Sequence, residues 1–394
     1  LAGDTVELPM IHIASGYAGV LAVDATTFTV PTLTADTATV GLALSACNSI
    51  TTLPDTVAYT LTGNGTLTRA LPGTTDVTIA SGTFTMGAGN QLSGRRVIVK
   101  SGATLDLKGT IQPTAITLSG GTLTNTGAAL ESMGQIQTYG ITLTADSTIS
   151  GTAAITSLAS NWNAHTLNLG GYTLTLTNSD TVYLVNTTLS NGTVVVSSGT
   201  LNLGDGNHGG AEATLNNVTI RTQNNATALF QRNYALTGTV VLDSGVKLSD
   251  GKTLTGAEAS LTLSANAFNG AATLTARNIT LTATELPTRY PTVACTTLTV
   301  DDNYKALIAA SEDARVQLAT VSGDAPTVNN LPEGRVRLVD NNALYAAIAM
   351  SALKAEVAGE QTLADLGWQN AETDESVAYT NIVRNLITEM TLTV

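Results

Sequence analysis

Few residues of this 394-residue sequence are of types that could do chemistry together, and the densest group is GDGNHGG at positions 204–210. Asp205, Asn207 and His208 could offer oxygen and imidazole ligands to Ca²⁺ or line a sugar site. One carboxylate beside one amide is nevertheless a poor oxygen cage for Ca²⁺. Glycine and asparagine are also the residues that tight turns require. The pattern therefore favours a turn over a metal site.

A second candidate is the carboxylate pair Asp301 and Asp302, which could act as a general acid and a general base. Neighbouring residues on an extended chain point to opposite faces, so these two carboxylates would not face one substrate. We expect a solvated corner at this point. We predict no catalytic residue, no cofactor and no metal ligand, and we expect that the protein is not an enzyme.

Short strands are the elements that would position any such residue, and they are clearest between Leu167 and Leu203. Each has aliphatic residues two apart, with Thr or Asn on the opposite face. The connections lack the two-residue Asn-Gly or Asp-Gly loops of antiparallel hairpins. A chain that keeps turning one way stacks such strands best, so we predict a parallel β-solenoid. The expected strands are Leu167–Leu169, Leu174–Leu176, Val182–Val185, Val194–Val196 and Leu201–Leu203.

Apolar triplets recur along the chain at a similar but not constant spacing, as stacked turns require. The variation predicts that the turns absorb insertions while the strands do not, which suits a wide three-sided helix. Either Leu167–Leu169 or Leu174–Leu176 could be the triplet that is counted for this turn, and the period is the same for both choices. The middle residues of the triplets are Thr78, Ile98, Thr117, Thr142, Asn168, Val195, Thr219, Val241, Thr262, Thr280 and Thr299.

Three stretches resemble the passenger repeats of bacterial autotransporter-type surface proteins: SGATLDLKG at 101–109, HTLNLGGYTLTL at 165–176 and NGTVVVSSGTLNLG at 191–204. The resemblance covers about residues 61–300. It implies an all-β fold, the right-handed parallel β-helix of pectin-lyase-like proteins, and a secreted life at a cell surface. It implies no activity, because one fold hosts many functions.

Composition agrees with a solenoid that has a threonine exterior. The chain has 69 threonines, 61 of them before Asp301, and β-branched residues suit pleated surfaces. The net charge is −13 and no basic run occurs, so we expect no binding to nucleic acid. No apolar stretch approaches the roughly 18 residues that span a bilayer, so membrane insertion is not expected.

Outward threonines recur with the triplets, and a flat threonine lattice is similar to the face of ice-binding solenoids. Such a lattice needs constant coil lengths to stay in register, and the spacing here varies. We therefore expect an ordinary sheet exterior. The threonines concerned are Thr78, Thr117, Thr142, Thr219, Thr262, Thr280 and Thr299.

Cys47 and Cys295 are the two cysteines, and they lie near opposite ends of the predicted helix. About twelve turns of roughly 4.8 Å would hold them tens of Å apart, too far for a disulfide within one chain. We predict two buried thiols, with an inter-subunit disulfide as the alternative.

The chain is predicted to divide into three parts. Residues 1–58 are a cap or irregular first turns, 59–300 are the parallel β-helix, and 301–394 are a mixed α/β C-terminal cap. The part after Val300 holds 20 of the 47 charged residues and 8 threonines, which marks a change of structure. Helices are expected at 346–360 and 372–389.

The two ends carry little protection against pairing with another molecule. No lysine or arginine precedes Arg69, and Thr391, Leu392, Thr393 and Val394 form an uncharged terminal strand. Either end could add to the sheet edge of another copy, and a head-to-tail contact of this kind builds filaments. We expect a homo-oligomer or filament, with surface glycans as further candidate partners.

These features favour a secreted or cell-surface protein with a structural or adhesive role, which assembles into a fibre or layer. The alternative is a β-helix that binds or degrades polysaccharides, which needs clustered charged side chains on consecutive turns. Basic residues between Arg96 and Lys252 are sparse for an anionic-sugar cleft. They are Lys100, Lys108, Arg221, Arg232 and Lys247.

Overall fold

A computed structural model describes residues 6–338 with gaps, and the expected helices at 346–360 and 372–389 lie outside the described residues. The gaps are 23–27, 30, 88–90, 93–94, 110–114, 129–140, 153–154, 157–164, 185–186, 205–212, 244, 269–271, 289–291, 313, 315, 320–326 and 333–334.

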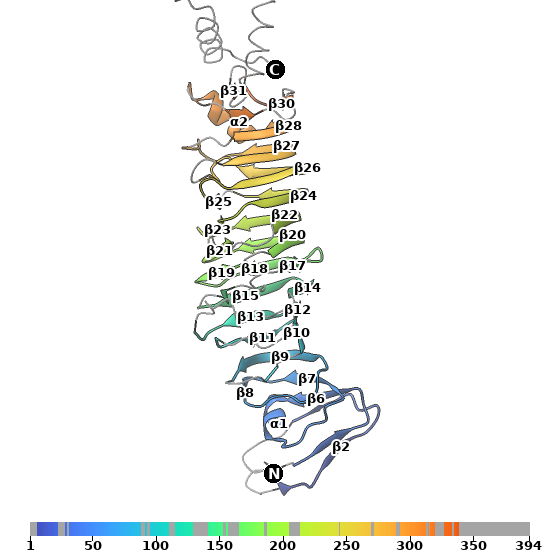
Figure 1. Ribbon diagram of the computed structural model, residues 1–394. Coiled ribbons are helices and arrows are strands. Elements are labelled where there is room, and N and C mark those ends of the chain that lie inside the picture. Colours follow the sequence, from blue (N-terminus) through green and yellow to red (C-terminus); the bar gives the residue numbers. More distant parts are fainter. Residues whose placement is uncertain are drawn as a thin grey trace, which may run out of the picture.

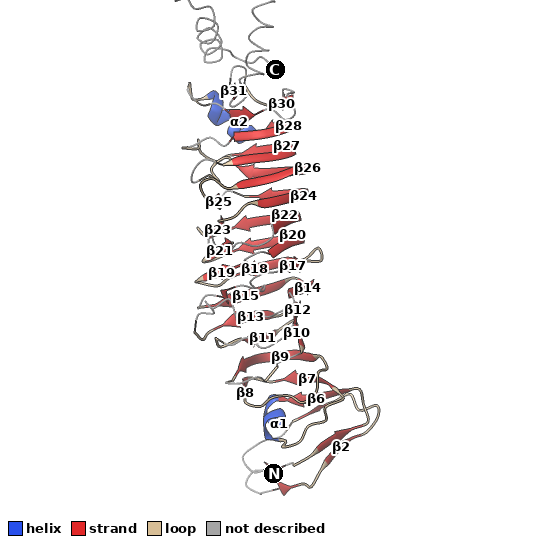
Figure 2. Cartoon of the chain, in the orientation of Figure 1, coloured by secondary structure: helices blue, strands red, loops and turns tan. Residues whose placement is uncertain are grey.

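The described residues form an elongated rod in which the chain winds through about 12 stacked turns (Figure 1). The rod is built mainly of strands joined by loops, with two helices in its described part (Figure 2). Named strands pair in parallel, and strands within the rod pair with strands one turn below and one turn above. The predicted parallel β-solenoid is therefore confirmed.

Each turn has up to three sides, named side A, side B and side C. Side A and side B meet at a corner, and in the lower turns most of their strands are separate. The separate strands of side A are β3 (Val20–Leu21), β6 (Thr39–Ala43), β7 (Ala58–Thr62), β10 (Arg96–Lys100), β12 (Ala115–Ser119), β14 (Ile141–Ala145), β17 (His165–Asn168), β29 (Val316–Ala319) and β31 (Val336–Leu338). Those of side B are β8 (Gly65–Leu67), β11 (Ala103–Asp106), β13 (Thr122–Asn125), β15 (Ser147–Gly151), β18 (Thr173–Leu176) and β30 (Thr327–Asn329).

Longer strands run across the corner, so that one strand supplies both sides. They are β9 (Val77–Met86), β20 (Thr187–Val196), β22 (Ala213–Thr222), β24 (Tyr234–Leu242), β26 (Thr253–Ser264), β27 (Thr273–Thr282) and β28 (Thr292–Val300). Side C is a five-stranded sheet of β16 (Ile155–Thr156), β19 (Thr181–Tyr183), β21 (Thr200–Leu203), β23 (Thr227–Phe230) and β25 (Val246–Leu248).

The corner between sides A and B uses residues that tolerate a left-handed backbone. Asn191, Asn217 and Gly238 have φ of 56°, 50° and 62° at the bends of β20, β22 and β24. The Asn217 side chain also ties successive turns together, because its Oδ1 accepts a hydrogen bond of 3.0 Å from the backbone N–H of Thr239. Asn and Gly are the residues for which this conformation costs least.

The register confirms most of the predicted column of triplets. Residues from Thr78 to Asn168 are successive partners on side A, and those from Thr219 to Thr299 are successive partners on side B. The step through Val195 is wrong: Asn168 pairs with Ser190, and Val195 pairs with Thr175. The predicted triplets therefore follow side A up to Asn168 and side B from Val195 onward. The change falls at β20 because this single strand supplies both sides.

The core is mainly a stack of aliphatic side chains. Leu189, Val194, Leu201 and Leu215 from β20, β21 and β22 are each fully buried. Burial of one such side chain stabilises the fold by about 1.5–3 kcal/mol. Because every turn contributes to the stack, the rod needs no separate hydrophobic centre.

Helix α1 (Leu44–Ser49) differs from the expectation that the chain up to about Ala58 is strand-like. It has no side-chain N-cap, but Leu44, Ala46 and Cys47 are buried, so packing on the core holds it. Below it, β2 (Ile11–Ile13) pairs with β5 (Leu33–Ala35). β1 (Val6–Glu7) pairs with β4 (Phe28–Thr29).

Helix α2 (Asp302–Ala309) follows β28, at the start of the part for which the sequence predicts a mixed α/β cap. After α2, β29 and β30 pair with β28, and β31 pairs with β29, which continues the parallel columns. The division at residues 58 and 300 stays a prediction for the chain as a whole. Neither described helix is long and apolar enough to cross a membrane.

Candidate functional site

Two of the sites that the sequence singled out lie outside the described residues. Asp205, Asn207 and His208 fall in the gap 205–212, and Thr391–Val394 lies beyond residue 338. The turn predicted for the first site and the assembly strand predicted for the second stay predictions.

The carboxylates of Asp301 and Asp302 have separate structural roles. Asp301 is the N-cap of α2, and its Oδ1 accepts a hydrogen bond of 2.8 Å from the backbone N–H of Tyr304. Asp302 Oδ1 accepts a hydrogen bond of 2.9 Å from Asn330 Nδ2. An N-cap of this kind stabilises a helix by about 1 kcal/mol. The pair thus holds α2 on the end of β28, where the sequence suggested only a solvated corner.

Both cysteines are buried free thiols, which confirms the prediction. Cys47 lies in α1 and Cys295 in β28, and at most 1% of either is exposed. Burial raises the pKa of Cys47 to about 11 and that of Cys295 to about 12. The thiolate is the reactive form of cysteine, so burial keeps both residues inert at neutral pH.

We therefore expect a thiol reagent such as DTNB to leave the native protein unmodified at pH 7 and to titrate two thiols per chain in guanidinium chloride. The raised pKa of Cys47 alone lowers its thiolate fraction about 100-fold relative to a free thiol. Absorbance of the released thiolate gives the count and the rate. Rapid modification of either cysteine in the native protein would contradict the buried placement.

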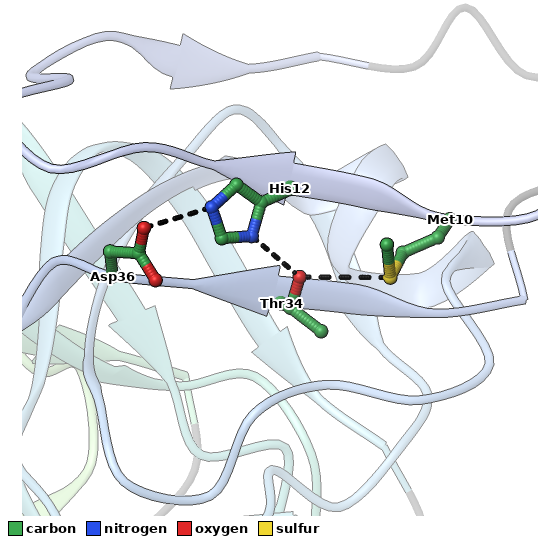
Figure 3. Close-up of polar contacts among 4 residues, drawn as sticks. All are labelled: Met10, His12, Thr34 and Asp36. Atoms are coloured by element: carbon green, nitrogen blue, oxygen red, sulfur yellow. Dashed lines mark hydrogen bonds and ion pairs between the residues drawn. The ribbon is translucent and has the colours of Figure 1, made fainter.

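A chain of polar side chains near the N-terminal end was not found from the sequence. His12 on β2 lies directly opposite Thr34 on β5 (Figure 3). Its Nδ1 is 2.9 Å from Thr34 Oγ1, and its Nε2 is 2.9 Å from Asp36 Oδ2. The Thr34 hydroxyl also donates to Met10 Sδ at 3.8 Å. The sequence signal was the step from His12 to Thr34, which matches the period of the solenoid.

Hydroxyl, imidazole and carboxylate in this order are the parts of an activated nucleophile. The setting differs from an active site, because 45% of the His12 side chain and 59% of the Asp36 side chain are exposed to solvent. Water is not excluded from the hydroxyl, and an exposed pair of this kind contributes at most about 1 kcal/mol. These polar side chains therefore act as a link between two neighbouring strands.

The most extended surface feature is a column of threonines on side B, called the threonine ladder. Its lower part is Thr83, Thr104, Thr122, Thr148 and Thr175, which are successive strand partners. Its upper part starts beside Thr175 and is Thr173, Thr193, Thr219, Val241, Thr262, Thr280, Thr299 and Asn329.

The ladder keeps its register although the lengths of the turns vary. The turn from Thr122 to Thr148 is longer than the turn from Thr262 to Thr280, yet each pair is in direct register. Within each part of the ladder the connections therefore absorb the difference in turn length. Between the two parts the threonines step to the next outward row at β18, because the direct partner of Thr175 is Val195. Along 12 strands the ladder contains no ionisable residue.

A second surface feature, called the N-terminal apolar surface, is formed by Leu8, Met10, Tyr17 and Val20. These side chains are 37%, 52%, 50% and 44% exposed. They are four of the five large hydrophobic residues exposed in the described part of the chain, and the fifth, Tyr172, lies far up the rod. Val20 belongs to β3, which pairs with β6.

Comparison with known proteins finds no match to a family model, to a curated protein or to a solved structure. The class of the molecule is therefore the one that its fold defines, a parallel β-solenoid.

Proposed function

We propose that the chain is a non-enzymatic structural or adhesive component of a secreted or cell-surface assembly. In this proposal it is a right-handed β-helix similar to autotransporter passengers, and copies join end to end into a filament or layer. The rod of about 12 turns supports this role, because its length and aliphatic core suit a spacer or fibre subunit. The polar groups of Asp301, Asp302 and His12 support it too, because they make contacts within the rod.

The observation that carries the proposal is the N-terminal apolar surface. Exposed apolar side chains that gather in one region mark sites of interaction with another molecule. Leu8, Met10, Tyr17 and Val20 all lie near the start of the chain, in or next to the strands of the first turn of the rod.

The strands of this end have free edges in the described part of the chain. β3 pairs with β6 on one side only, and β2 pairs with β5 on one side only. An unpaired edge offers backbone donors and acceptors to an incoming strand. The occupant that we propose is the opposite end of a second copy, because β30 and β31, the last strands in the described part, are parallel to the strands below them, and a second copy could continue these columns. Such a contact is heterologous and builds an open filament.

Val20→Lys should weaken assembly, because a charged side chain on an edge strand opposes pairing. We expect the full chain to form concentration-dependent oligomers in sedimentation velocity and filaments or layers in electron micrographs. Val20→Lys should need an about tenfold higher concentration, corresponding to about 1.4 kcal/mol. The matched control Tyr172→Lys, on the side of the rod, should assemble like the parent.

Deletion of Leu1–Ala14 or of Thr391–Val394 should also reduce assembly, because each removes one of the two proposed partners. If the parent and every variant stay monomeric at high concentration, the proposal of self-assembly fails. Turnover of a polysaccharide from a broad panel, abolished by a single Asp or His substitution, would overturn the non-enzymatic role and favour the alternative.

A further inference from the structure

The hydroxyls of the threonine ladder are unused by the rod itself. No hydrogen bond joins a ladder hydroxyl to another residue in the part of the chain that the structure describes, whereas Thr75, Thr126 and Thr222 elsewhere donate to protein groups. Each ladder threonine therefore presents a free hydroxyl, which can donate one hydrogen bond and accept two, beside a methyl group. The ladder is thus a repeating neutral surface of hydroxyls and methyls.

The repeat of this surface is fixed by the backbone. Parallel strands lie about 4.7–4.9 Å apart, and outward residues two apart on one strand are roughly 6.6 Å apart. In the upper turns a second polar row stands beside the ladder in the same register. This row is Thr239, Ser260, Asn278, Thr297 and Thr327. Side B therefore carries a two-dimensional lattice over five turns, which is polar at every position except Val241.

The chemistry of the lattice selects among ligands. The two rows themselves contain no aromatic ring on which a sugar could stack and no charged side chain that would hold a phosphate, a carboxylate or a metal ion. Charged residues stand beside them, including Arg221 next to Thr219 and the Glu258–Arg277 ion pair next to Ser260 and Asn278. Threonine is stiff at χ1, so little side-chain entropy is lost when a ligand orders the surface. A ligand that fits is neutral, hydrogen-bonds through alternating donors and acceptors, and repeats at a period near that of parallel strands.

Ordered water in ice meets these requirements, since its oxygens repeat along the crystal surface at a distance close to the strand spacing. We propose that the threonine ladder is an ice-binding face, on which the hydroxyls and methyls order a layer of water that joins the ice lattice. Roughly 50 Å of ladder would contact the crystal, because 12 strands are stacked along it.

Thr280→Tyr tests the proposal at the centre of the lattice. The ring would stand above neighbouring threonines and hold the ice plane away from them, while tyrosine keeps the preference for strand. The matched control is Thr142→Tyr, an exposed threonine on side A. Circular dichroism and thermal unfolding of both variants check the fold, and Thr219→Tyr is the second ladder variant.

The readouts are recrystallisation of ice in frozen sucrose and adsorption of the fluorescently labelled full chain to a single ice crystal. We expect the parent and Thr142→Tyr to slow crystal growth and to coat the crystal. Thr280→Tyr and Thr219→Tyr should need an about tenfold higher concentration. A parent protein that leaves crystal growth unchanged, or a folded ladder variant as active as the parent, would overturn the ice-binding face.

Discussion

Replacement of Arg95 by methionine is expected to lower the free energy of unfolding by about 3 kcal/mol, because it leaves four backbone carbonyl groups without this buried donor. Only 1% of Arg95 is exposed. Its guanidinium donates to the backbone carbonyls of Leu71 and Thr75 at 3.1 and 2.7 Å, and also to those of Pro72 and Gly73. One side chain thus ties the segment before β9 to the next turn.

Burial lowers the pKa of Arg95, because the charged guanidinium is held away from water, while the Tyr59 side chain acts in the opposite direction. Methionine fills much of the volume but offers no hydrogen bond. The loss should therefore appear as local opening as well as lower global stability.

Arg96→Met is the matched control, since Arg96 lies next in the chain and points outward. It pairs with Asp76, and 53% of its side chain is exposed. Its loss should change stability by no more than about 0.5 kcal/mol. Guanidinium unfolding compares the two variants, and hydrogen exchange at residues 71–79 reports the local effect. Equal free energies of unfolding for the two variants would show that the buried Arg95 guanidinium does not stabilise the fold.

The strands and their parallel stacking could be predicted because both depend on short-range patterns. Aliphatic residues two apart define a strand locally, and the recurrence of triplets such as those centred on Thr117 and Thr142 marks successive turns. All five strands expected between Leu167 and Leu203 overlap strands of the structure. The core follows from the same pattern, because inward positions alternate with outward ones.

Features that depend on register between turns could not be predicted. Arg95 and Arg96 are neighbours of one type, and only the path of the chain decides that one is buried. The link from His12 to Asp36 requires knowing that β2 and β5 are partners. The threonine ladder was missed as a continuous surface because its members shift from one outward row to the next at β18.

Gly82→Ala is expected to destabilise the rod far more than Gly102→Ala, although both glycines occupy the corner before a side B strand in neighbouring turns. Gly82 lies within β9, opposite Ala103, so Gly102 lies at the same corner one turn higher. Both have positive φ, +86° and +77°, which costs a residue with a Cβ about 1 kcal/mol.

The difference lies in the space around them. A Cβ on Gly82 would overlap the carbonyl oxygen of Gly63 in the turn below, whereas a Cβ on Gly102 would meet nothing within 4 Å. The backbone at Gly82 cannot move away easily, because the N–H of Thr83 donates to Asn64 Oδ1 at 2.7 Å. We expect a loss of about 3 kcal/mol for Gly82→Ala and about 1 kcal/mol for Gly102→Ala.

Denaturant unfolding of the two variants measures the difference, and hydrogen exchange at Thr83 shows whether the corner has opened. Because each turn of a solenoid contacts only its neighbours, the damage should stay between β7 and β11 and leave the upper turns protected. Similar losses for the two glycines would mean that left-handed strain alone sets the cost. The close approach of successive turns would then play no part in fixing the corner.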